Sequence, residues 1–286
     1  MGYVVTGATG QLGGLVVDGL LAAGVPADRI AAVVRDEHKA ARLRDLGVEL
    51  RVADYDDAEA LRTVFRTGDR VLLVSASEPG RREPQHRNVI EAARAADVAL
   101  LAYTSILGGP DADFILAADH KATEQVILDS GVPYTLLRNG FYHEVYTDTI
   151  PQILERGAVT ASAGDGRLAT AARADYAAAA VAVLTGQGHE GKAYELSGDT
   201  AWSFADFAAE LSKQTGREIA YHPLTTDEHR NTLLQAGLPE PVADLVADID
   251  RAIERGLLAR TSEDLRHLTG RPATTLADAI ATALKG

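Results

Sequence analysis

The chain contains no cysteine. This absence excludes disulfides, thiolate metal ligands and a cysteine nucleophile, and it is consistent with a reducing compartment, so we expect a cytoplasmic protein. No apolar run approaches the ~18 residues that a membrane-spanning helix needs. The first residues lead directly into a strand pattern without a charged leader or a cleavage site, so we expect no signal peptide.

Basic charge is also scarce. The 286 residues include 28 Lys and Arg against 41 Asp and Glu, which gives a formal net charge of −13. Nucleic-acid-binding proteins usually carry a basic surface, and an acidic surface is repelled by anionic membranes. We therefore expect a small-molecule partner, no nucleic acid and no membrane, for a protein that is a monomer or a homodimer. Hydrophobic residues make up 46% of the chain, enough for one large α/β domain or a domain with a smaller lobe.

The first half alternates short apolar runs with helical patterns. The runs are rich in Val, Ile, Leu and Ala on both faces, which is typical of parallel strands covered on both sides. Strands are predicted at 3–6, 30–34, 48–53, 70–75, 98–104 and 134–138, with helices at 11–23, 37–46, 58–65, 85–96 and 120–129. This alternation predicts an α/β fold with a doubly wound parallel sheet and helices on both of its faces.

The second half is less regular. We expect a helix over 175–184 with Asp175 as its cap, a strand at 192–196, and a helix capped by Ser203 that runs to about residue 213. Beyond Arg217 the chain looks mostly helical and ends in a helix at 275–284. These patterns predict a small, mostly helical C-terminal lobe near the carboxyl edge of the sheet, where ligands of such folds bind.

The most informative motif is the run Thr6-Gly-Ala-Thr-Gly-Gln-Leu-Gly13, which follows a strand and begins an amphipathic helix. In a dinucleotide-binding turn, the first glycine permits the tight turn, the second lets the backbone approach a diphosphate, and the third allows helix and strand to pack closely. The helix N-terminus adds free N–H groups for the phosphates. A purely structural turn is the alternative. The residues expected to contact the cofactor here are Gly7, Thr9, Gly10, Gln11, Leu12 and Gly13.

The second strand ends at Arg35, about twenty residues beyond the turn. An acidic residue at this place would bind the ribose 2′-hydroxyl of NAD, whereas a guanidinium suits the 2′-phosphate of NADP. Arg35 therefore favours NADPH, and a surface ion pair with Asp36 or Glu37 is the alternative. Lys39 and Arg42 follow on a helix and are equally consistent with solvent exposure.

The next strand ends supply further candidates. Asp54 and Tyr55 end the third strand, where they would reach the adenine ring or cap the following helix. The small side chains of Ser75, Ala76 and Ser77 would leave room for a cofactor ribose, or form a plain loop. On the fifth strand, Thr104 offers a hydroxyl to the cofactor.

Several motifs together resemble the NmrA-like group of atypical short-chain dehydrogenase/reductases, and within it the type 2 NAD(P)H:quinone oxidoreductases. The motifs are the glycine run, Pro84 to Ala93, Tyr103-Thr-Ser105, Tyr134 to Tyr142, Arg173-Ala-Asp-Tyr-Ala177 and Tyr194 to Gly198. The resemblance implies a Rossmann-like domain of residues 1–140 to which 166–195 return, and a substrate lobe of 141–165 and 196–286. It also implies NADPH, a quinone or similar flat acceptor beside the nicotinamide, no flavin and no metal.

The wider superfamily uses a Tyr-x-x-x-Lys pair, and Lys121 matches its lysine, but four residues earlier the chain has Ala117. Reducing a ketone needs a general acid, whereas a quinone is reduced to a much less basic phenolate. The gap therefore favours a quinone. Lys121 would contact ribose or nicotinamide, and Tyr142, His120 or water would supply the proton. An exposed helix lysine and a capping or solvent-facing histidine are the alternatives.

The acceptor is expected near the carboxyl ends of the fifth and sixth strands. Ile106 would wall the pocket, Asn139 would bind a carbonyl, and Phe141 and Tyr142 would stack on a ring. Packing between the lobes is the alternative. Because the tyrosine is missing, a regulator that senses NADP(H) without turnover is a second hypothesis, and an epimerase or an ether-type reductase is a third.

Overall fold

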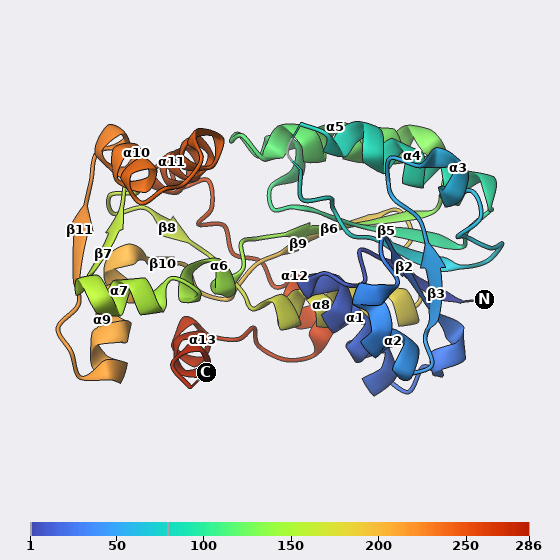
Figure 1. Ribbon diagram of the computed structural model, residues 1–286, viewed down its shortest axis with the longest axis horizontal. Coiled ribbons are helices and arrows are strands. Elements are labelled where there is room, and N and C mark those ends of the chain that lie inside the picture. The colour runs from blue at the N-terminus through green and yellow to red at the C-terminus, as the bar shows by residue number, and fades with distance from the viewer. Residues whose placement is uncertain (1, 79, 286) are drawn as a thin grey trace.

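In the computed structural model of the chain, which describes residues 2–78 and 80–285, seven strands form one parallel sheet (Figure 1). The strand order is β3-β2-β1-β4-β5-β6-β9, so the chain reverses its direction of travel between β1 and β4. The strands are β1 Tyr3–Thr6, β2 Ile30–Val34, β3 Glu49–Val52, β4 Arg70–Leu73, β5 Leu100–Ile106, β6 Tyr134–Asn139 and β9 Lys192–Leu196. The predicted doubly wound parallel sheet is confirmed.

Helices cover both faces of the sheet (Figure 1). One face carries α1 Gln11–Ala22, α2 Ala41–Asp45, α8 Arg173–Thr185 and α12 Asp264–Thr269, and the other carries α3 Ala58–Leu61, α4 Arg82–Ala95 and α5 Ala117–Ser130. Neighbouring residues of a strand serve opposite faces: Val5 packs with α1 and α8, whereas Val4 packs with α3 and α4. This double burial explains why the strands are apolar throughout rather than alternating.

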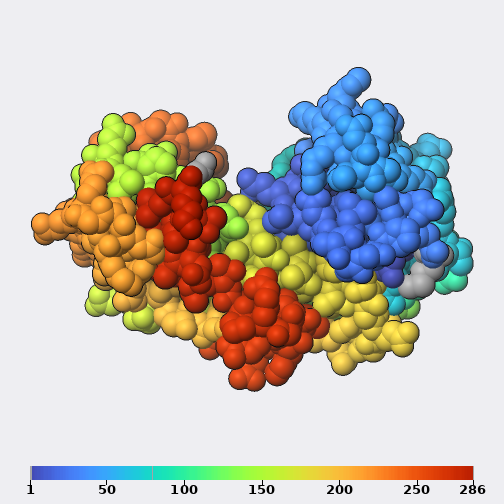
Figure 2. All heavy atoms as spheres, turned by 90° about the horizontal axis from the view of Figure 1, so that it is seen from below, coloured from blue at the N-terminus to red at the C-terminus, as the bar shows by residue number. Residues whose placement is uncertain are grey.

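A smaller lobe follows the sixth strand. Two short strand pairs, β7 with β11 and β8 with β10, are joined by helices around a third core that contains Trp202, Phe204 and Phe207. Its elements are α6 His143–Thr147, α7 Ile150–Arg156, β7 Ala158–Ala161, β8 Arg167–Leu168, β10 Trp202–Ser203, α9 Phe204–Thr215, β11 Ala220–Pro223, α10 Thr226–Gln235, α11 Glu240–Glu254 and α13 Leu276–Ala283. Figure 2 shows the surface notched between this lobe and the blue N-terminal part.

The lobe is not a continuous stretch of chain. Strand β9 pairs with β6 at the edge of the large sheet, and Leu265 of α12 is buried in the same core as α1 and α8. The chain therefore crosses between the two parts several times. No helix within residues 2–78 and 80–285 combines the length and the hydrophobicity needed to span a bilayer.

Some element predictions were wrong in detail. The helix expected at 37–46 is a 3₁₀ turn, His38–Ala40, followed by the short α2, and the His38 N–H bonds to the Asp36 carboxylate, a local contact that competes with regular helix. The helix expected at 58–65 ends at Leu61, and the chain continues in tighter turns. The Thr63 hydroxyl donates a hydrogen bond to the Ala60 carbonyl there at 2.8 Å. The fourth strand ends at Leu73 rather than at residue 75.

The C-terminal half also differs from expectation. Helix α8 begins at Arg173, so Asp175 is not the cap residue; it lies in the first turn and accepts a hydrogen bond from the Ala172 N–H at 3.2 Å. Strand β11 interrupts the region that was expected to be helical beyond Arg217, because its backbone completes the edge of β7. Ser203 caps α9 as predicted, accepting a hydrogen bond from the Asp206 N–H at 3.2 Å.

Candidate cofactor and acceptor site

The glycine turn lies between β1 and α1, beside the point where the strand order reverses. Gly7 has φ +58°, in the left-handed region that favours glycine, and the Gly10 N–H donates to its carbonyl at 2.9 Å. A Cβ atom on residue 13 would lie 2.4 Å from the same carbonyl oxygen. Gly13 is thus required for the first turn of α1 to rest against the β1 turn.

Helix α1 begins with an uncapped N-terminus. Gly10 is the N-cap residue and has no side chain to occupy the backbone N–H groups of Gln11, Leu12 and Gly13. Such groups at the end of a 12-residue helix attract an anion through hydrogen bonds and the helix dipole. The Leu12 side chain itself is buried in the core, and that of Gln11 is exposed, so both residues would act through their backbone.

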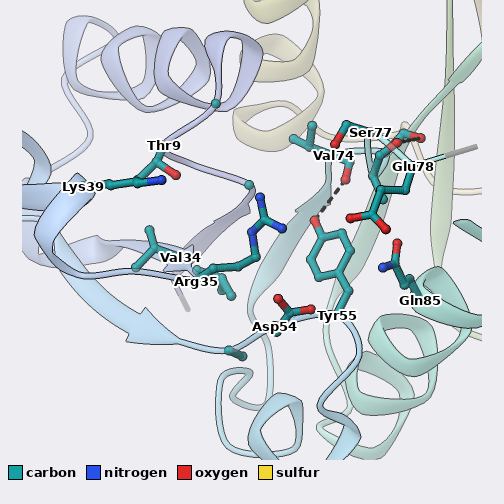
Figure 3. A pocket seen from close by; sticks show the side chains of 16 residues that line it. Thr9, Val34, Arg35, Lys39, Asp54, Tyr55, Val74, Ser77, Glu78 and Gln85 are labelled. Atoms are coloured by element: carbon teal, nitrogen blue, oxygen red, sulfur yellow. Dashed lines mark hydrogen bonds between the residues drawn. The ribbon is translucent and has the colours of Figure 1, made fainter. Parts of the chain in front are cut away.

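A cavity of about 390 Å³ opens next to this turn (Figure 3). The predicted residues among its lining are Gly7, Thr9, Gly10, Arg35, Asp54, Tyr55, Ser75, Ala76 and Ser77, joined by Val33, Val34, Lys39, Ala53, Val74, Glu78 and Gln85. Most of these residues follow the carboxyl ends of β1, β2, β3 and β4, and Gln85 comes from the beginning of α4. The structure therefore brings most of the predicted cofactor residues to one cavity.

Arg35 directs its guanidinium into this cavity (Figure 3). Its neighbours are engaged elsewhere: Glu37 pairs with Arg44 at 3.1 Å, and Asp36 accepts a hydrogen bond from the His38 N–H at 2.9 Å. Within the described residues, Arg35 itself forms no hydrogen bond or ion pair. The alternative of a surface ion pair with Asp36 or Glu37 is therefore not what the structure shows.

Asp54 and Tyr55 line the cavity beside Arg35, beyond the neighbouring strand β3 (Figure 3). The helix that follows is capped by Asp57, which accepts from the N–H groups of Glu59 and Ala60 at 3.1 and 2.9 Å, so capping is not the role of Asp54 or Tyr55. The Asp54 carboxylate accepts a hydrogen bond from the backbone N–H of residue 56 at 2.9 Å. Burial raises the pKa of the Tyr55 phenol, which stays protonated as a donor.

The chain just beyond β4 is held by side chains instead of by a strand ladder. The Thr6 hydroxyl accepts from the Val74 N–H at 3.0 Å, and the Thr104 hydroxyl accepts from the Ser75 N–H at 2.8 Å. The Tyr55 hydroxyl donates to the Val74 carbonyl at 2.9 Å. Here β4 separates from its neighbours, which explains both the early end of the strand and the opening of the cavity. Thr104 thus supports the cavity wall from behind.

The predicted catalytic residues do not line this cavity. His120 is buried, with Nδ1 2.8 Å from the Tyr103 hydroxyl, and burial together with the nearby Arg82 lowers its pKa to about 3. Lys121 is half-buried on α5 and has no hydrogen bond or ion pair within the described residues. Ala117, four residues before it, is the first residue of that helix and is buried.

The predicted acceptor residues gather where β6 runs into the lobe. Asn139 is buried, and its Oδ1 atom has no hydrogen-bond partner within the described residues. The Phe141 ring lies 6.2 Å from that of Phe114, which also packs with the buried Ile106. An unpaired buried carbonyl oxygen is costly unless a ligand or water satisfies it.

Tyr142 lies beside these residues, where its phenol interacts with the Asn139 side chain, and its ring also packs against α8. The Arg173 guanidinium is 5.0 Å from the centre of its ring, and the ring of Tyr176 meets it edge-on at 5.4 Å. Burial raises the pKa of the Tyr142 phenol, so the group is protonated at neutral pH. A protonated phenol is a competent proton donor, although its packing also fits the alternative of a contact between lobes.

Sequence reasoning missed Gln85 and Glu78, which line the cavity from the beginning of α4 and the loop before it. Gln85 is buried; its Nε2 donates to Asp56 at 3.2 Å, whereas its Oε1 has no partner within the described residues. A signal existed in the Pro84 to Ala93 motif, but nothing in the motif alone shows that its first turn faces the cavity.

The fold and this cavity define a nucleotide-binding α/β protein: a glycine turn, a free helix N-terminus and a cavity at the reversal of strand order occur together. Residues 7–187 match the family model described as NAD(P)H-binding. The chain belongs to this family, and NAD(P)H is its cofactor.

Particular relatives are close over nearly the whole chain. Quinone oxidoreductase 2 of Escherichia coli is 47% identical over 276 residues, which are 96% of each protein. The crystal structure of the NADPH-dependent quinone oxidoreductase of E. coli with NADPH superposes with a TM-score of 0.96 at 46% identity, covering 99% of both chains. The triphenylmethane reductase of a Citrobacter species with NADP(H) gives 0.94 at 39% identity, covering 98% of this chain and 99% of the other. The resemblance stated from the motifs is confirmed, and the chain is an oxidoreductase.

Proposed function

We propose that the protein transfers a hydride from NADPH to a quinone or a related conjugated acceptor without a flavin. The NADPH part of the proposal rests on Arg35, whose guanidinium points into the cavity beyond β2 and has no ion pair within the part of the chain that the structure describes. The E. coli relatives, whose names state NADPH and quinone, support the rest.

The residues present fit this cofactor. The backbone N–H groups from Gly7 to Gly13 would hold the diphosphate, Arg35 the 2′-phosphate, and the Asp54–Tyr55 wall the adenine end. The small side chains of residues 75–77 leave room for a ribose. When bound, NADPH supplies the hydride. One quinone, one hydride and one proton together give the hydroquinone, so this chain must bring the acceptor close and allow one proton to reach it.

Asn139, Phe141, Tyr142 and Ile106 are the proposed acceptor residues. The buried Oδ1 of Asn139 has no hydrogen-bond partner within the described residues and is therefore available to a ligand, and the aromatic rings match a flat acceptor. The proton would come from the Tyr142 phenol or from water, since a phenolate oxygen needs little acid catalysis. His120 is neutral at pH 7 and would donate only as neutral imidazole, and Lys121 would contact the ribose or nicotinamide.

The proposal also assigns cofactor binding and acceptor binding to two different parts of the chain. Residues 1–140 together with 166–195 would bind the cofactor, and residues 141–165 and 196–286 would form the acceptor lobe. The pairing of β9 with β6 and the separate core around Trp202 support it. Helix α12 is the part of the second range that packs against the cofactor side.

The test is steady-state oxidation of NADPH with a panel of benzoquinones and naphthoquinones, using protein shown by its absorbance spectrum to carry no flavin. We expect acceptor-dependent turnover with NADPH and much weaker turnover with NADH. Binding of NADPH without turnover on any quinone would contradict the proposed acceptor class.

A regulator that senses NADP(H) is the second candidate. The specific observation in its favour is Ala117, which leaves the position of the superfamily's proton-donating tyrosine without a hydroxyl. Such a protein would bind NADP(H) in calorimetry and give no acceptor-dependent rate, so the same pair of measurements separates the two candidates.

A further inference from the structure

Both backbone polar groups of Ala76, a residue in the cavity wall, are held by side chains of α4. The Ala76 N–H donates to Nε2 of His86 at 2.9 Å, and its carbonyl accepts from Nε of Arg82 at 2.7 Å. Two side chains that lie four residues apart on one helix therefore bind the N–H and the carbonyl of the same residue. No regular strand ladder constrains this segment, since β4 has already ended at Leu73.

The neighbours of His86 fix which of its nitrogens carries the proton. The Thr123 hydroxyl donates to the Asp119 carbonyl at 2.8 Å, so its single proton is already used. Its oxygen lies 2.9 Å from Nδ1 of His86 and must therefore accept from that nitrogen. This leaves Nε2 of a neutral His86 as the acceptor that the Ala76 N–H requires. His86 is fully buried, and burial followed by the charge of Arg82 lowers its pKa to about 3, in agreement with a neutral ring.

We propose that His86 is a positioning residue for the cofactor: locked in its Nδ1–H form by Thr123, it holds Ala76 so that the cavity wall beyond β4 keeps the shape that accepts the coenzyme. The proposal rests on the proposed function for the identity of that coenzyme. His86 does not reach the cavity itself, because it does not belong to the lining, whereas Ala76 does. Its effect is therefore on binding rather than on the reacting atoms.

Two matched variants separate its two hydrogen bonds. In His86→Gln the amide oxygen reaches the place of Nε2 and keeps an acceptor for the Ala76 N–H. In His86→Asn the amide reaches only the place of Nδ1, so the bond to Thr123 is kept and the bond to Ala76 is lost. By calorimetry we expect His86→Asn to raise the Kd for NADPH about tenfold, the effect of one ordinary hydrogen bond, and His86→Gln to stay within about threefold of the wild type.

Thr123 provides an independent arm. Thr123→Ser keeps the hydroxyl and should bind NADPH as the wild type does, whereas Thr123→Val removes the acceptor that fixes the ring and should weaken binding several-fold. Thermal unfolding of all four variants is the companion measurement, because a merely structural role would lower the Tm of both histidine variants alike and leave the Kd values equal. If His86→Asn does not fold, the threonine pair decides.

Equal NADPH affinity in His86→Asn and His86→Gln, or in Thr123→Val and Thr123→Ser, would overturn the proposal. The kcat at saturating NADPH with a quinone should change by less than about twofold in the folded variants, since only coenzyme binding is affected. Absence of quinone turnover in the wild type would instead contradict the proposed function and leave the binding comparison intact.

Discussion

Arg35 shows how a single side chain would set cofactor choice. It stands at the end of β2, where a carboxylate would favour the unphosphorylated ribose, and its guanidinium has no ion pair within the described residues to compete with a ligand. The acidic residues beside it are occupied by Arg44 and by the backbone. A 2′-phosphate would therefore meet a free, planar donor.

For Arg35→Ala we expect weaker NADPH binding and unchanged NADH binding. A hydrogen bond to a charged group contributes about 1.5–3 kcal/mol, so the Kd for NADPH should rise by roughly one to two orders of magnitude. Calorimetric titration with each coenzyme measures both values. Arg42→Ala is the matched control, because Arg42 is exposed and pairs with Asp18 instead. An equal loss of affinity for NADPH and NADH would show that Arg35 does not read the 2′ position.

Asn139 makes the corresponding prediction for the acceptor. Its buried Oδ1, which has no partner among residues 2–78 and 80–285, lies where the lobe meets the end of β6. Asn139→Ala removes the amide, so the acceptor KM should rise about tenfold or more, as expected for one lost polar contact, while NADPH affinity barely moves. Steady-state kinetics together with coenzyme titration separate the two effects. Equal losses in both would contradict the assignment.

At the scale of secondary-structure elements, the junction of β1 with α1 decides whether a cofactor site exists. Helix α1 has two consecutive glycines in its first turns, and they differ sharply in their surroundings. A Cβ on residue 13 would meet the Gly7 carbonyl at 2.4 Å, whereas one on residue 14 would be 3.6 Å from the Ala8 carbonyl. Only the first glycine is needed for close packing of the turn and the helix.

Gly13→Ala should therefore destabilise the protein and weaken coenzyme binding, since the helix must move away from the turn that it supports. Overpacking of this kind costs about 1–3 kcal/mol. Gly14→Ala should be neutral or stabilising by up to about 1 kcal/mol, because alanine is the better helix former. Urea unfolding and NADPH titration of the two variants provide the comparison. Identical behaviour of both would show that the packing argument is wrong.

At the scale of the whole molecule, burial of histidine couples stability to pH. The pKa values of His86 and His120 are lowered to about 3, in both cases mainly by burial. Between about pH 6.5 and pH 3 the unfolded chain binds these protons and the folded chain does not, so the free energy of unfolding falls as the pH falls. Above about pH 6.5 neither histidine contributes to the slope.

We expect each histidine to contribute up to about 1.4 kcal/mol per pH unit to this loss. Urea unfolding from about pH 7.5 down to about pH 5 measures the slope. His120→Gln should reduce the slope by about one proton relative to the wild type measured in the same buffers. A slope that does not respond to His120→Gln would mean that the ring is already charged in the folded protein.

The fold class and much of the cofactor site could be predicted from the sequence alone. Apolar runs buried on both faces predicted the parallel sheet, because every residue of such a strand must be covered. The glycine spacing and Arg35 predicted cofactor residues because each depends on local chemistry at a known strand end. Residues 54–55 and 75–77 were predicted to contact the cofactor for a similar reason, because the carboxyl ends of the strands of a parallel sheet meet at one edge.

Only the tertiary structure determined the features of the site that depend on residues far apart in the sequence. The early end of β4 results from the hydroxyls of Thr6 and Thr104, which lie 68 and 29 residues away from their backbone partners. Only the packing of α4 beside the cavity brings Gln85 into the lining and His86 behind Ala76, and the tautomer of His86 depends on Thr123, 37 residues further on. Hydrophobic periodicity predicts which face of a helix or strand is buried, but it does not predict which distant side chain packs against that face. These contacts could therefore be identified only in the folded structure.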